Sequence, residues 1–90
     1  MEAESISIPN RLKLHRKLSG LTQTQVARLL GFQTVTQLSQ WENGADMPSS
    51  TNLLKLGIIY GTFPNELYFE YYQSLKKALK AKEDLSGEIF

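Results

Sequence analysis

The sequence predicts an all-α domain of five helices, in which the last helix extends beyond a compact body. Apolar residues recur at helical spacing along most of the chain, from Leu12 to Leu79. Glycines at positions 20, 31, 44 and 61 follow these apolar segments, at places where helices commonly end. Ninety residues with 41% apolar composition and no cysteine indicate a single domain without disulfide bonds.

Residues 1–9 are expected to form a flexible arm, because they carry two acids and two serines but little that a core could bury. The first helix should begin at Pro9 or Asn10 and end at Gly20. Polar residues are interspersed among its leucines, some of which should face inward: Leu12, Leu14 and Leu18.

The segment from Leu21 to Gly44 predicts two short helices joined by a glycine turn. The earlier helix runs from about Gln23 to Leu30, with Thr22 as its N-cap. Gln25 lies three residues after the cap and can complete a capping box. Gly31 can end the helix in the left-handed conformation, which costs other residues more.

The second of these helices is predicted from about Val35 to Glu42. Thr34 with Gln37 repeats the cap signal, and an Asn-Gly pair ends the helix. Leu38 and Trp41 give it a buried side. Two capped helices joined across a glycine describe a helix-turn-helix, whose second helix can enter the major groove of DNA.

The remaining helices are predicted from residue 49 or 50 to Gly61, and from Pro64 onward. The earlier one is apolar nearly all round and should be the most buried element. The later one should continue past residue 68, and residues 69–90 are assigned to this extension. Its apolar residues recur every four positions: Leu67, Tyr71, Leu75 and Leu79.

Several residues between positions 10 and 68 follow the order of a known family. They are Arg16, Gly20-Leu21-Thr22-Gln23, Val26-Ala27, Gly31, Trp41-Glu42, Gly44, Pro48 and Glu66-Leu67. On these residues the chain resembles the lambda-repressor-like and Cro-like regulators, the XRE family, which implies a five-helix domain that binds double-stranded DNA. The family usually has ten positions between the turn glycine and the closing glutamate. Gly31 and Glu42 lie eleven apart, so Phe32–Thr34 forms a turn longer by one residue.

The exposed face of the 35–42 helix is expected to contact bases. Once the buried positions are removed, the candidates are Val35, Thr36, Gln37 and Gln40. Glutamine can pair bidentately with adenine, and the methyl groups of valine and threonine can contact a thymine methyl. The resemblance places Thr36 and Gln40 at positions that face base edges. The alternative is an ordinary solvated helix face.

Phosphate contacts are expected at Gln23, which the resemblance implies is a backbone-contacting residue at the start of its helix. Further candidates are Thr22, Thr34, Asn43, Arg11, Lys17 and Lys55. For most of the basic residues, a solvated charge is an equally good interpretation. The family also pairs an arginine with a glutamate at positions that match Arg16 and Glu42, and this ion pair is expected to be structural.

Composition and charge narrow the function classes. The net charge is only +1, but positions 10–55 contain six basic and two acidic residues, which favours a modest basic face. One histidine and no cysteine do not suggest a metal site. No motif indicates a cofactor or catalysis, so the protein is expected not to be an enzyme. No segment is apolar enough for a membrane span or a signal peptide, which favours a cytoplasmic protein. The resemblance implies a bacterial or phage origin.

Four aromatic residues cluster where the last helix begins: Tyr68, Phe69, Tyr71 and Tyr72. They point in different directions on a helix, so some must face solvent or another chain. We expect a homodimer formed by Tyr68, Tyr71, Tyr72, Leu75 and Leu79. The alternative is that only Leu67 and Tyr71 face the core, while the other rings lie flat on the surface.

These features favour a transcriptional regulator, a repressor that binds a pseudo-palindromic operator as a homodimer. Two alternatives stay open. The chain could be the antitoxin of a toxin–antitoxin pair, holding a toxin through its C-terminal extension while it represses its own operon. It could instead be a protein-interaction module that has kept the fold without binding DNA.

Overall fold

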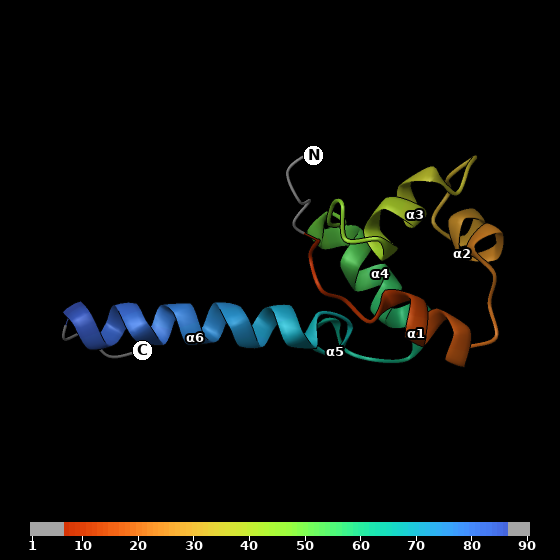
Figure 1. Cartoon of the computed structure of the whole chain (residues 1–90). Coiled ribbons are helices and arrows are strands. Elements are labelled where there is room, and N and C mark those ends of the chain that lie inside the picture. The colour runs from red at the N-terminus through yellow and green to blue at the C-terminus, as the bar shows by residue number, and fades with distance from the viewer. Residues whose placement is uncertain (1–6, 87–90) are drawn as a thin grey trace.

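The computed structural model describes residues 7–86, and over this range the chain is helical without β-strands. The helices are α1 (Leu12–Leu18), α2 (Gln23–Leu29), α3 (Thr36–Glu42), α4 (Ser50–Tyr60), α5 (Pro64–Leu67) and α6 (Phe69–Ser86). The first five pack into a compact body, and α6 projects from it (Figure 1). No helix in this part of the chain is both long and apolar enough to cross a membrane.

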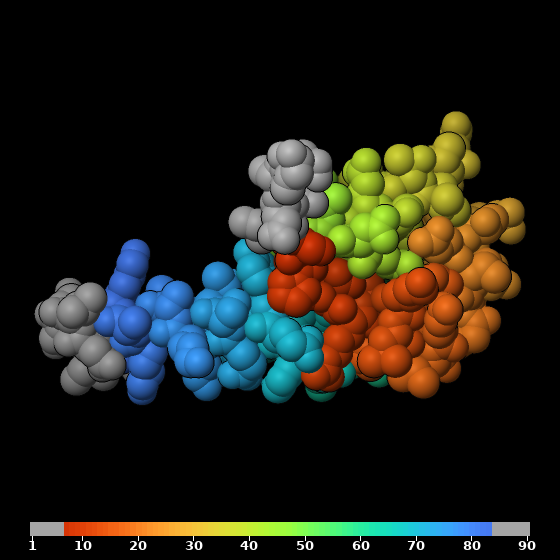
Figure 2. Space-filling view, viewed as in Figure 1, coloured from red at the N-terminus to blue at the C-terminus, as the bar shows by residue number. Residues whose placement is uncertain are grey.

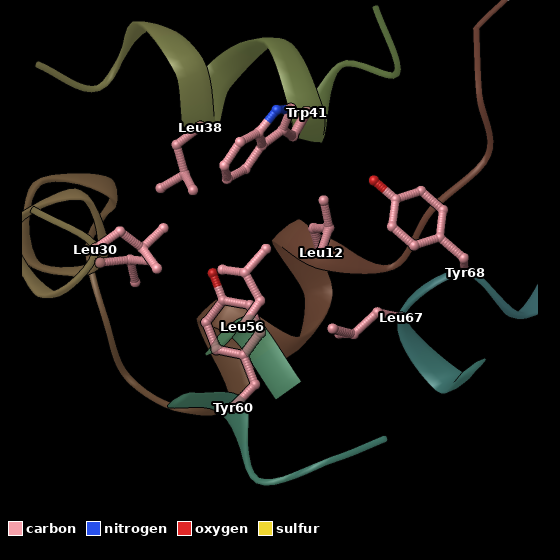
Figure 3. Packing of buried hydrophobic residues seen from close by; sticks show 9 residues of the cluster. Leu12, Leu30, Leu38, Trp41, Leu56, Tyr60, Leu67 and Tyr68 are labelled. Carbon is pink, nitrogen blue, oxygen red and sulfur yellow. The ribbon is translucent and has the colours of Figure 1, made fainter. Parts of the chain in front are cut away.

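The core lies where all five short helices meet. It consists mainly of Leu12 from α1, Val26 and Leu30 at α2, Leu38 and Trp41 from α3, Leu56 and Tyr60 from α4, and Leu67 with the adjoining Tyr68. Figure 3 shows these side chains pointing inward from opposite sides of the body. Because α3 contributes two of the largest buried side chains, its position is set by the core.

α4 is buried on one face only, contrary to the prediction that it would be the most buried element. Leu56 and Tyr60 are in the core, but Leu54 is 59% exposed and Ile58 is 80% exposed. The reason is the small size of the body, which has too few helices to surround α4. In the same way, α1 buries Leu12 and leaves its other leucines exposed.

The expected single helix from Pro64 onward is divided into α5 and α6 by a break at Tyr68. The backbone there has φ −123° and ψ 41°, outside the helical region. Both Leu67 and Tyr68 are buried. Side chains of consecutive helical residues diverge by about 100°, and the break lets both of these large side chains enter the same core. The chain turns at Tyr68, and α6 then leaves the body as a sixth helix.

The ends of α2 match the predicted signals. Thr22 Oγ1 accepts a hydrogen bond from Gln25 N at 3.1 Å, and Gln25 Oε1 accepts one from Thr22 N at 2.9 Å, so the capping box is complete. Gly31 has φ +84° and follows the end of the helix. The cap predicted at the next helix is wrong: Val35 is the N-cap residue and its side chain makes no capping hydrogen bond.

The segment before α1 is held against the end of α3. Ile8 N donates to Gly44 O at 2.9 Å, and Ser7 Oγ donates to Asn43 O at 3.0 Å. Gly44 has φ +78°, and a Cβ atom there would lie 2.6 Å from Ile8 O. Residues 7–9 of the expected arm are therefore attached to the body, whereas the first six lie outside the described residues.

Candidate nucleic-acid interface

α3 presents one polar face to solvent and one apolar face to the core. Thr36, Gln37 and Gln40 are exposed, while Leu38 and Trp41 are buried. Val35 precedes the helix as its N-cap and is half-buried, so it is less accessible than the other three base-contacting candidates. The accessible face of α3 thus carries two amides and one hydroxyl, all of which can form hydrogen bonds with base edges.

The C-terminal end of α3 is tied to α1 by a buried ion pair between Arg16 and Glu42. Arg16 Nε donates to Glu42 Oε2 at 2.6 Å, and Nη2 donates to Oε1 at 3.1 Å. The Glu42 side chain is only 3% exposed. The hydrogen bonds to Glu42 raise the pKa of Arg16 above its ordinary value. Arg16 Nη1 also donates to Leu21 O at 3.0 Å, so one guanidinium connects α1, the loop before α2, and α3.

Gln23, the first residue of α2, joins the same network. Its Nε2 donates to Glu42 Oε1 at 3.0 Å. The carboxylate accepts hydrogen bonds only, so it orients the amide with the NH₂ group inward. One N–H of that group is committed to Glu42, and the second can donate to another acceptor, such as a phosphate oxygen.

Asn10 is a positioning residue that the sequence reasoning did not single out. Its Oδ1 accepts from Leu12 N at 3.0 Å. Its Nδ2 donates to Trp41 O at 3.1 Å, to Glu42 O at 3.3 Å and to Ile8 O at 3.1 Å. An asparagine just before a helix is a capping signal, but nothing in the sequence links it to carbonyls 31 and 32 residues away.

A polar groove of about 670 Å³ separates the α2–α3 turn and α3 from the start of α4. Thr34, Thr36 and Gln37 line one wall, and Ser49 with Asn52 lines the other. Ser49 is the N-cap of α4 and accepts a hydrogen bond from Asn52 N at 3.2 Å. These two residues were absent from the predicted contacts, although a serine at a helix start is a readable signal.

The remaining backbone-contact candidates differ in what they can reach. Four of them are exposed: Thr22 at the N-cap of α2, Asn43 at the end of α3, Lys17 on α1 and Lys55 on α4. Thr34 is also exposed, and its Oγ1 accepts a hydrogen bond from Thr36 N at 3.4 Å. The groove thus includes Thr34, but it does not include either lysine.

Arg11, one of the candidate phosphate contacts, is paired with two carboxylates of its own chain. Its Nη1 lies 2.7 Å from Glu66 Oε2, its Nη2 lies 2.6 Å from Glu70 Oε2, and its guanidinium carbon lies 4.7 Å from the Phe69 ring centre. His15 Nε2 also lies 3.0 Å from Glu66 Oε2. The hydrogen bonds from His15 and Arg11 lower the pKa of Glu66 below its ordinary value. Arg11 therefore attaches α1 to α5 and α6.

The residues predicted to form a dimer fall into two groups. Tyr68 is only 5% exposed and its burial raises the pKa of its hydroxyl to about 12, so its ring is not available to a partner. Tyr71 is half-buried and packs edge-on against Tyr68 at 6.4 Å. Tyr72, Leu75 and Leu79 are 46%, 47% and 50% exposed. Phe69, directly after the break, is also 41% exposed, so exposed apolar side chains occur along α6 from its first residue.

A model of a known helix-turn-helix family matches residues 12–67, which is most of the described chain. The chain belongs to the XRE family of helix-turn-helix proteins. Searches of curated proteins and of solved structures each found no match. As an XRE-family member, the chain is a DNA-binding regulator in which α2 and α3 form the helix-turn-helix. The match ends at Leu67, so α6 lies beyond the family domain.

Proposed function

We propose that the protein is a sequence-specific repressor of transcription, which binds a pseudo-palindromic operator in double-stranded DNA as a homodimer. The observation that carries this proposal is the division of α3 into a buried and an exposed face. Leu38 and Trp41 hold the helix in place, so Thr36, Gln37 and Gln40 stand on a rigid support. Polar side chains that are preorganised in this way lose little entropy when they pair with bases.

Contacts to the DNA backbone would come from the ends of helices and from nearby side chains. Gln23 has one amide N–H committed to Glu42 and a second that can donate to a phosphate. Thr22, Thr34 and Asn43 are exposed and offer further polar groups, and Lys17 and Lys55 add charge. Contacts of this kind fix the position of α3 on the duplex without reading sequence.

The proposed dimer rests on the exposed face of α6. Tyr72, Leu75 and Leu79 follow the i, i+3, i+7 spacing that lets one helix pack along another. α6 projects from the body (Figure 1). No other part of the chain covers these three side chains fully, and about half of each is exposed. A second copy related by a two-fold axis would bury these side chains. It would also place the two α3 helices about 34 Å apart, which is the length of one turn of DNA.

An antitoxin that represses its own operon is the second candidate. The supporting observation is that α6 lies outside the family domain and exposes apolar residues which a different protein could cover. Co-purification of the natural chain with one small protein, together with a monomeric state when it is purified alone, would favour the antitoxin over the homodimer.

The decisive experiment selects DNA from a random library at stated salt concentrations and compares Gln23→Ala with Gln40→Ala. Gln40→Ala should lose about 1–3 kcal/mol on the selected operator and relax preference at one base pair per half-site. Gln23→Ala should weaken binding to all sequences alike. The logarithm of affinity should fall with the logarithm of salt concentration by about 0.9 per neutralised phosphate. A wild-type chain that selects no common sequence would contradict the proposal and favour an interaction module.

A further inference from the structure

The turn between α2 and α3 is an ordered ridge that is anchored at both ends. Phe32 N donates to Ala27 O at 2.8 Å, and the Phe32 ring packs edge-on against Trp41 with 5.8 Å between ring centres. Val35, at the other end, is half-buried. Gly31 starts the turn with φ +84°, a conformation that other residues rarely adopt. The backbone of the turn is therefore held at both of its ends.

The two residues at the tip of this ridge, Gln33 and Thr34, are exposed. The ridge continues beyond the N-terminal end of α3 and projects outward at the same edge of the molecule (Figures 1 and 2). A hollow lies on each side of it. One is the 670 Å³ groove toward α4, and the other, of about 320 Å³, lies toward α2 and includes Thr24 and Arg28. Gln33 and Thr34 line both hollows.

We propose that Gln33 is a specificity-determining residue, whose amide reads an adenine next to the bases contacted by α3. This inference rests on the proposed function and deepens it. Glutamine can form a bidentate pair with adenine, in which its Oε1 accepts a hydrogen bond from N6 and its Nε2 donates one to N7. A ridge with space on both sides can enter a major groove, because the two DNA strands that flank the groove would lie over the hollows and would not collide with the protein. The anchors at both ends lower the entropy cost of holding the backbone of the tip in place.

Of the two residues at the tip, Gln33 is better suited to this contact than Thr34. Thr34 Oγ1 already accepts from Thr36 N at 3.4 Å, which directs its hydroxyl toward the start of α3. Gln33 has the longer side chain and carries a donor and an acceptor together. Gly31 and Glu42 lie eleven positions apart, and the resemblance to the family implies a turn that is longer by one residue.

The test is DNA selection with the full-length chain, comparing wild type with Gln33→Ala, Gln33→Arg and Gln40→Ala. Gln73→Ala, an exposed glutamine on α6, is the matched control. Gln33→Ala should lower affinity for the selected site roughly 5- to 150-fold and remove one adenine preference per half-site. The position that it affects should differ from the position that Gln40→Ala affects. Gln33→Arg should change the preferred base at that position from adenine to guanine, because arginine pairs bidentately with guanine.

Three results would overturn the inference. Unchanged preference in both Gln33 variants would mean that the turn does not reach bases. An equal loss of affinity on every sequence would make Gln33 a backbone contact. A wild-type chain that selects no common sequence would remove the proposed function, and this inference with it. Since Gln33 is exposed, equal thermal melting of wild type and variants should show that no result comes from misfolding.

Discussion

At the scale of single residues, Glu42 connects three helices through one carboxylate. It accepts hydrogen bonds from Arg16 on α1 and Gln23 at the start of α2, and it belongs to α3 itself. The relative placement of the helix-turn-helix and α1 therefore depends on a charge that is almost entirely shielded from water. The same carboxylate orients the amide proposed to bind phosphate, so stability and DNA contact share one residue.

Arg16→Ala should lower the free energy of unfolding by about 3–5 kcal/mol, because it leaves the Glu42 carboxylate buried without its cation. Urea denaturation at constant pH measures the change. The control is Arg28→Ala, which removes an exposed arginine and should change stability by less than about 0.5 kcal/mol. A loss below 1 kcal/mol in Arg16→Ala would contradict the structural role of the pair.

At the scale of helices, α1 is attached to α5 and α6 by a group of charged residues on the surface. Arg11 contacts both Glu66 and Glu70, and His15 contacts Glu66. The pKa of Glu66 is lowered from 4.5 by its hydrogen bonds with His15 and Arg11, and that of Glu70 is lowered from 4.5 by its hydrogen bond with Arg11. These contacts fix where α6 leaves the body.

The two lowered pKa values predict a loss of stability in acid. A carboxyl whose pKa is lower in the folded state stabilises the fold above its unfolded pKa, and the effect disappears as the pH falls through the folded value. The free energy of unfolding should therefore fall as the pH drops below about 4.5. Glu66→Gln with Glu70→Gln should flatten that dependence. Equal pH profiles for wild type and the double variant, from urea denaturation at a series of pH values, would disprove the role of this contact.

How well each helix could be predicted depends on how local its signals are. α2 could be placed from the sequence because Thr22, Gln25 and Gly31 act on residues next to them. The break at Tyr68 could not, because the spacing of Leu67 and Tyr71 is the same in a continuous helix. The deciding factor is the packing of Tyr68 into a core formed by distant parts of the chain.

The candidate site was predictable to a similar degree. The exposed face of α3 follows from helical spacing once Leu38 and Trp41 are assigned to the core. The position of Arg11 did not follow, because a count of charges cannot identify carboxylates 55 and 59 residues away as its partners. Asn10 was missed for the same reason, since its main-chain partners come from the far end of α3.

At the scale of the whole molecule, the compact body and the projecting α6 make different contributions to the structure. The body contains the helix-turn-helix and every large, fully buried side chain among the described residues. α6 adds an apolar face with about half of each large side chain exposed. The body can therefore keep its fold when the face of α6 is changed.

Leu75→Gln with Leu79→Gln should give a folded chain that is largely monomeric and binds its operator poorly, because the apolar contact between two α6 helices is lost. Analytical ultracentrifugation over a range of concentrations measures the change. The control is Lys77→Gln with Lys80→Gln, which alters the other side of the same helix and should leave the dimer intact. Removal of the chain from Lys76 onward should likewise produce a monomer. A wild-type chain that is monomeric at high concentration would contradict the proposed dimer.

The separation of the two faces of α3 also has an evolutionary consequence. Thr36, Gln37 and Gln40 take no part in the core, and the residues that hold the helix in place do not face outward. Substitutions on the outer face can therefore accumulate with little loss of stability. After a gene duplication, each copy could acquire a different target while both remain folded. Randomised libraries at these three positions should for the same reason yield mostly folded proteins, from which new DNA preferences can be selected.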